Sequence, residues 1–138
     1  PIQKGCAEVL AEGTYAALFA IGSMVETAWQ VRKKLAEKGI PTTVVNARFA
    51  MPLDKNCLRK LAESHPLLVT MEENVASGGF GEHVAAFLEE EALHTKVLRI
   101  AIPDCFVEHG SVGELKKALG LDADSVTEKI LAELPEEL

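Results

Sequence analysis

Two adjacent carboxylates followed by a glycine-rich turn form the stretch with the most obvious chemical potential. Glu72 and Glu73 follow a strongly apolar run, and residues 77–81 (SGGFG) then lead into an amphipathic pattern. Adjacent carboxylates could act as a general acid–base pair or bind a metal ion. A glycine-rich turn that opens a helix can hold phosphate on its free backbone N–H groups.

The details of this stretch favour a structural role. The glycines match neither GxGxxG nor GxxxxGK[ST], and the carboxylates would repel a phosphate. We expect the glycines to supply positive φ angles and to let a helix pack closely on a sheet. Neighbouring side chains on a strand point to opposite faces, so Glu72 and Glu73 should not converge. One of them is expected to cap the helix or to pair with Arg48 or a lysine.

A second candidate is the loop PDCFVEHGS, which carries Asp104, Glu108 and His109. It joins a predicted strand to a predicted helix, where ligand-binding loops of α/β proteins occur. No HExxH or paired histidine spacing is present, so no zinc site is predicted. His83 and His94 are expected at the surface. The candidate ligand-facing or interface-facing residues are Glu72, Glu73, Asn74, Ser77, Gly78, Gly79, Asp104 and His109.

Composition limits the class of protein. The chain has 138 residues and a net charge of −7, with no basic stripe, which disfavours nucleic acid as a partner. No apolar run is long enough to span a membrane. Cys6, Cys57 and Cys105 are few and widely spaced, which predicts free thiols in a reducing compartment. The chain starts at Pro1 instead of Met, so we expect a fragment of a longer protein.

Apolar strands and amphipathic helices alternate along the sequence. Residues 6–13 and 15–22 are two apolar runs joined at Glu12-Gly13, which predicts a hairpin and an antiparallel edge strand. Further strands are expected at 42–47, 67–71 and 97–102. Helices are expected at 24–38, from Asp54 to His65, from the SGGFG turn, from Ser111 to Gly120, and from Asp124 to Pro135.

These elements predict an α/β fold. We expect a three-layer sandwich, with a five-stranded, mostly parallel sheet, one antiparallel edge strand, and helices on both faces. In such sheets, ligands bind beyond the carboxyl ends of the strands. Taken alone, the residues show no complete catalytic group, and the function stays open.

Four stretches, in order, resemble a known family. They are ALFAIGSMV, VVNARFAMPLD, LLVTMEENVASGGFGEHVAAFL and LRIAIPDCFVEHGSVGELKKALGLDADSV. Together they are similar to the C-terminal domain of the 1-deoxy-D-xylulose-5-phosphate synthase family. This family belongs to the transketolase-like, thiamine-diphosphate-dependent enzymes. The pair NARF-x-x-PLD and IPD-x-F-x-x-HG is the more specific part of the match.

The resemblance implies a single transketolase-like C-terminal domain over residues 1–138. The full-length enzyme of this family is a homodimeric transferase that uses thiamine diphosphate and Mg²⁺. It decarboxylates pyruvate and adds the two-carbon unit to glyceraldehyde 3-phosphate, for isoprenoid, thiamine and pyridoxal synthesis. The implied location is the bacterial cytoplasm, or a plastid for a plant or algal source.

The resemblance carries over no catalytic, cofactor-binding or metal-binding residue. In the family, a Gly-Asp-Gly motif of another domain holds the diphosphate and Mg²⁺, and this sequence has no such motif. The domain is therefore expected to be inactive alone and to serve in packing against the other domains and in the dimer. Two alternatives remain: a partner-docking domain of a keto-acid dehydrogenase β subunit, and an anion-binding regulatory module.

Overall fold

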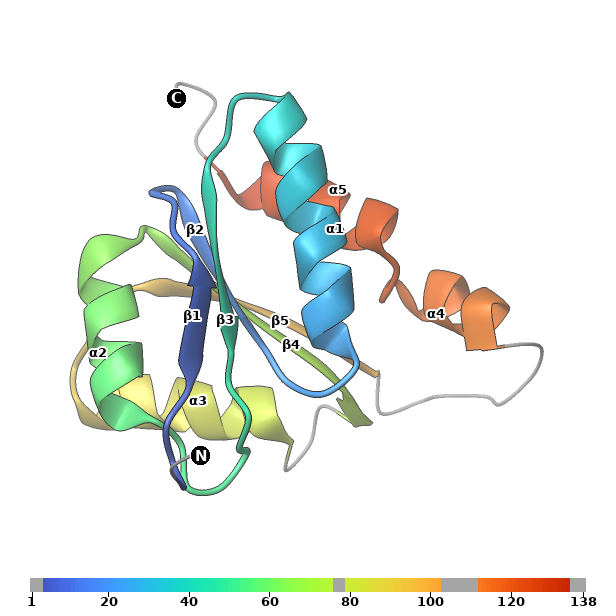
Figure 1. Cartoon of the computed structure of the whole chain (residues 1–138). Coiled ribbons are helices and arrows are strands. Elements are labelled where there is room, and N and C mark those ends of the chain that lie inside the picture. Colours follow the sequence, from blue (N-terminus) through green and yellow to red (C-terminus); the bar gives the residue numbers. More distant parts are fainter. Residues whose placement is uncertain (1–3, 76–78, 103–111, 135–138) are drawn as a thin grey trace.

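The computed structural model describes residues 4–75, 79–102 and 112–134 and has one mixed sheet with helices on both faces (Figure 1). The elements, in chain order, are β1 (Glu8–Ala11), β2 (Ala16–Ala20), α1 (Met24–Glu37), β3 (Thr42–Asn46), α2 (Lys55–Ser64), β4 (Leu67–Val75), α3 (Phe80–Glu90), β5 (Lys96–Ile102), α4 (Val112–Leu119) and α5 (Ala123–Glu133). Within these ranges, no helix has the length and apolar character needed to cross a membrane.

The sheet has the strand order β1-β3-β2-β4-β5. Strands β2 to β5 run parallel to their neighbours, and β1 is antiparallel to β3. Helices α1 and α5 cover one face and α2 and α3 cover the other (Figure 1). This confirms the predicted three-layer α/β fold with an antiparallel edge strand.

The central strand β2 is buried on both faces, which explains its uninterrupted apolar sequence. Leu18 packs into the core beneath α1 and α5, while Phe19 packs into the core beneath α2 and α3. The Phe19 ring stacks on Phe80 of α3 at a centroid distance of 5.3 Å. The sheet therefore carries two separate apolar cores, one on each face.

The predicted hairpin between the first two strands is wrong, because β3 lies between them. The chain turns at Gly13, whose N–H donates to the Thr43 hydroxyl at 2.8 Å. Thr14 and Tyr15 donate their N–H groups to the Pro41 carbonyl at 3.2 and 3.3 Å. The connection thus passes the start of β3. Skipping one strand requires a span of about 10 Å, which a short extended connection can make.

Two predicted boundaries of α2 are confirmed. The Asp54 carboxylate accepts a hydrogen bond from Cys57 N–H at 3.0 Å, as expected of an N-cap. The helix ends at Ser64, and His65 before the proline is extended, with φ −129° and ψ 135°. Asp54 also accepts from Ala7 N–H at 2.8 Å, so the same side chain fixes the segment that leads into β1.

Other boundaries differ from the prediction. The N-cap of α5 is Asp122, which accepts from Ser125 N–H at 3.2 Å, while Asp124 lies in the first turn. Strand β4 continues past Met71 to Val75, with an irregular register against β5. Helix α4 ends before Gly120, as predicted, but Ser111, the predicted start of this helix, lies outside the described residues.

Candidate functional site

Glu72 is a completely buried carboxylate that caps α3. It projects from β4 and is 0% exposed. One of its oxygens accepts from Phe80 N–H at 2.9 Å and the other from Gly81 N–H at 2.5 Å. The first N–H groups of a helix lack partners within the helix and carry partial positive charge. The chain's own carboxylate therefore occupies the position where a bound anion would meet α3.

Gly81 lets the first turn of α3 approach the sheet. A Cβ at this position would lie 2.7 Å from the Thr70 hydroxyl oxygen, 3.0 Å from a Glu72 oxygen and 3.2 Å from Arg99 Nε. Close packing is thus confirmed as a reason for a glycine. The expected positive φ is wrong at Gly79, whose φ is −85°, and at Gly81, which is helical.

Glu73 points to the opposite face of the sheet. Its carboxylate lies 2.7 Å from the ammonium of Lys116 on α4 and also accepts a hydrogen bond from Ser23. The contact with Lys116, followed by the one with Ser23, lowers the pKa of Glu73 below its usual 4.5. The two adjacent carboxylates diverge, as strand geometry predicted. They do not form an acid–base pair.

Because the pKa of Glu73 is lowered in the folded state, its small contribution to the free energy of unfolding depends on pH. This contribution is present above pH 4.5 and is lost as the pH falls through the lower pKa of the folded state. We expect Glu73→Gln to cost less than about 1 kcal/mol at neutral pH, since the pair is exposed. Urea unfolding of both proteins at decreasing pH should show the difference disappear. A difference that stays constant in acid would contradict the assignment.

The other predicted residues are only partly described. Gly79 is the N-cap of α3 without a side-chain hydrogen bond, and Asn74 lies in β4. Ser77, Gly78, Asp104 and His109 lie outside the described residues. Arg48 pairs with Glu8 at 3.1 Å and, among the described contacts, with neither Glu72 nor Glu73. The expected helix cap and the expected pairing with a lysine are both confirmed, at Glu72 and Glu73. The sequence did not indicate that the lysine is Lys116 or that Ser23 also contacts Glu73, since no local pattern connects them.

The described histidines do not form a metal site. His94 is exposed as expected, but His83 is half-buried, with its Nδ1 covered and unpartnered among the described residues. His65 is buried, and its Nε2 lies 2.7 Å from the Thr43 hydroxyl. Within the described ranges, no group of three or more His, Cys, Asp or Glu residues could hold a metal ion.

A hollow of about 690 Å³ lies between α2 and the segment around β1, and both Cys6 and Cys57 line it. Neither cysteine forms a disulfide within the described residues, and both are half-buried. Burial, with a smaller contribution from Asp54, raises the pKa of Cys57 from 9.0 to about 11. A nucleophilic cysteine needs the opposite shift. Cys57 is therefore suited to packing and not to catalysis.

Alkylation should reveal this property of Cys57. In the folded protein at mildly alkaline pH, we expect slow reaction with iodoacetamide, with a rate that rises as the pH approaches about 11. Peptide mapping by mass spectrometry would follow the residue, with the urea-unfolded chain as the reference. Asp54→Asn should accelerate the reaction while keeping an N-cap residue. Equal rates in the folded and unfolded chains would refute the prediction.

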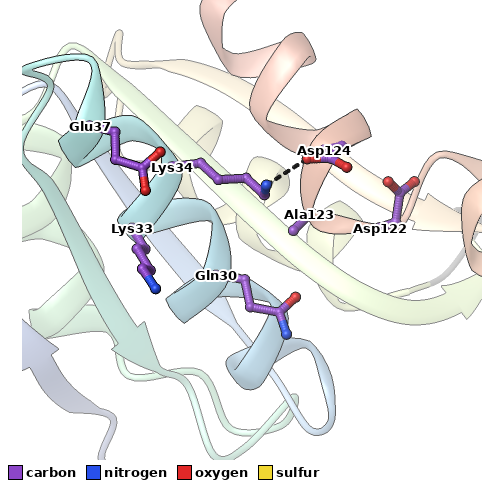
Figure 2. Close-up of a pocket in the computed structure, with 7 residues that line it drawn as sticks. All are labelled: Gln30, Lys33, Lys34, Glu37, Asp122, Ala123 and Asp124. Atoms are coloured by element: carbon purple, nitrogen blue, oxygen red, sulfur yellow. Dashed lines mark ion pairs between the residues drawn. The ribbon is translucent and has the colours of Figure 1, made fainter.

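A polar hollow of about 510 Å³ lies between α1 and the start of α5 (Figure 2). Lys34 reaches across it to Asp124, with an N–O distance of 2.7 Å. Its other charges include Lys33, Glu37 and Asp122, so both signs are mixed. The pair is solvent-exposed and contributes little to stability. This hollow has no feature that selects a ligand.

The fold and these contacts define a mostly parallel α/β domain with an antiparallel edge strand. In this domain, the Glu72 carboxylate of β4 caps the N-terminus of α3. The family model for the C-terminal domain of transketolase matches residues 5–126, so the chain belongs to this family. Among solved structures, a split-gene transketolase described as an inactive β4 tetramer superposes with a TM-score of 0.89 and 30% identity. That match covers 95% of this chain and 43% of the other. Transketolase from Campylobacter jejuni, at 19% identity and a TM-score of 0.62 over 94% of this chain and 19% of its own, shares the fold.

Curated relatives are more similar in sequence. The 1-deoxy-D-xylulose-5-phosphate synthase of Lachnoclostridium phytofermentans is 54% identical over 127 residues, covering 91% of this chain and 20% of the relative. Synthase 1 of Geobacter metallireducens is 47% identical over 131 residues, covering 94% and 21%. The chain thus spans about a fifth of the length of these relatives.

Proposed function

We propose that residues 1–138 form the C-terminal domain of a 1-deoxy-D-xylulose-5-phosphate synthase. The observation that carries this proposal is the 54% identity to a protein of that name over 91% of the chain. The complete enzyme would be a transferase that condenses pyruvate with glyceraldehyde 3-phosphate and releases CO₂. We place it in the bacterial cytoplasm, since the similar synthases come from bacteria. We expect a homodimer because the family resemblance implies one.

The described residues do not fit thiamine diphosphate or its Mg²⁺. The N-terminus of α3 is the natural place for a diphosphate in this sheet, but Glu72 already accepts from its first N–H groups. A second negative group there would meet a buried carboxylate. The proposal therefore assigns the cofactor and the catalytic residues to the other domains of the enzyme.

The role proposed for this domain is structural. Glu72 holds the start of α3, and the Glu73 pair with Lys116 ties β4 to α4 on the other face. These contacts fix the end of β4 and the start of α3. In the full enzyme, we expect the segments 72–81 and 104–110 to flank the approach to the active site. Packing against the other domains and within the dimer completes this role.

The alternatives have weaker support. An anion-binding module conflicts with the cap that Glu72 already provides at the N-terminus of α3. Calorimetric titrations with phosphate and nucleotides that show no heat of binding would exclude it. A docking domain of a keto-acid dehydrogenase β subunit would use the acidic surface against a basic partner. The synthase names among the relatives favour the first proposal.

A chimera tests the proposal. This chain would replace the matching C-terminal region of the L. phytofermentans synthase, with which it shares 54% of residues. We expect the chimera to form 1-deoxy-D-xylulose 5-phosphate from pyruvate and glyceraldehyde 3-phosphate. The isolated chain, supplied with both substrates, thiamine diphosphate and Mg²⁺, should show no turnover. A folded but inactive chimera, or an active isolated chain, would refute the proposal.

A further inference from the structure

An exposed apolar hollow lies between the β3–α2 loop and α3. It has a volume of about 290 Å³, and its apolar lining residues are Met51, Pro52, Leu53, Ala86 and Phe87. Met51 is 67% exposed, the largest exposed fraction among the three exposed large hydrophobic residues of the described chain. A concave apolar patch of this kind on a small domain is typical of a contact surface.

The polar residues that line the hollow are Lys55, Glu90 and His83, so its rim carries charges of both signs. The Lys55 ammonium lies 5.8 Å from the centre of the Phe87 ring. Within the described ranges, no carboxylate forms an ion pair with Lys55, whereas Arg59, which also lies near the Phe87 ring, is paired with Glu91. An apolar side chain that fills the hollow, with a neighbouring carboxylate on the side of Lys55 and away from Glu90, would match this lining.

The position of the hollow indicates where such a partner comes from. The segment that enters β1 runs along the β3–α2 loop, which forms one wall of the hollow (Figure 1). A Cβ on Gly5 would lie 3.2 Å from Pro52 Cγ, and Ala7 N–H donates to Asp54 at 2.8 Å. Polypeptide that precedes this segment would therefore reach the domain beside the hollow. In the relatives, about four fifths of the chain lies outside the matched region.

We propose that this hollow is the docking surface for the domain that precedes the present one in the full-length synthase. An apolar side chain of that domain enters between Met51 and Phe87, and a neighbouring carboxylate pairs with Lys55. This inference rests on the proposed function, because it requires a longer synthase chain. Beyond the proposed function, the inference names the surface of this domain that makes the interdomain contact and the side chains that take part in it.

Methionine oxidation gives a direct readout of docking. The sequence has three methionines, and Met24 and Met71 are both 0% exposed, so Met51 is the accessible one. Hydrogen peroxide converts an accessible methionine to its sulfoxide, with water as the other product. We expect rapid oxidation of Met51 in the isolated chain and marked protection in the chimera, measured by peptide mass spectrometry.

Variants test the specificity of this protection. Ala86→Glu places a charge on the opposite wall of the hollow and should restore Met51 oxidation in the chimera. Ala36→Glu, at a similarly exposed alanine on α1, is the matched control and should leave Met51 protected. An active chimera in which Met51 oxidises as fast as in the isolated chain would overturn the docking surface alone. An inactive, folded chimera would overturn the proposed function, whatever happens at Met51.

Discussion

Replacing Glu72 by alanine should destabilise the domain by roughly 3 to 5 kcal/mol, because two buried N–H groups lose their acceptor at about 1–3 kcal/mol each and a cavity adds to the cost. The N–H groups belong to Phe80 and Gly81, and the Glu72 side chain is 0% exposed. The measurement is the free energy of unfolding from urea denaturation followed by circular dichroism. Glu72→Gln keeps one acceptor oxygen and should lie between the wild type and the alanine variant.

The neighbouring carboxylate is a matched control for Glu72. Glu73→Ala removes a carboxylate one residue away, but one that is exposed and paired with Lys116. Its cost should stay below about 1 kcal/mol. Similar losses for the two alanine variants would show that Glu72 does not hold α3 in the way the structure indicates.

The second large effect is expected at the corner between β1 and β2. A Cβ on Gly13 would lie 2.3 Å from the backbone nitrogen of Thr42 and 2.5 Å from the carbonyl carbon of Pro41. Backbone atoms at the start of a parallel strand cannot move away as a flexible side chain can. We expect Gly13→Ala to cost about 3 kcal/mol, the upper end for overpacking, in the same unfolding measurement.

Gly39→Ala separates this clash from a general effect of losing a glycine. Gly39 has a φ of +76°, and a Cβ added there would meet nothing within 4 Å, so only backbone strain changes. That strain costs about 1–2 kcal/mol. If Gly13→Ala proved no more harmful than Gly39→Ala, the chain would not pass the start of β3 as tightly as described.

Local patterns predicted the elements well because their causes are local. The apolar run of β2, the Asp54 cap and the His65-Pro66 boundary each follow from a few neighbouring residues. The strand order near the N-terminus has a different cause. A short connection at Gly13 is compatible with a hairpin and with a step over one strand, and only the contacts with Pro41 and Thr43 decide between them.

The same distinction holds for the candidate site. The alternation of side chains along a strand predicted that Glu72 and Glu73 diverge, and a helix cap was expected from one of them. The sequence could not indicate which one, because that depends on the face that α3 covers. Lys116 lies far along the chain from Glu73, so no local pattern predicts their pairing.

Product formation by the chimera shows whether this domain completes a 1-deoxy-D-xylulose-5-phosphate synthase. The assay would compare the chimera with the parent synthase and with the parent lacking its C-terminal region, each confirmed as folded. We expect 1-deoxy-D-xylulose 5-phosphate from the chimera and the parent, and none from the truncated protein. A folded chimera that forms no product would contradict this expectation.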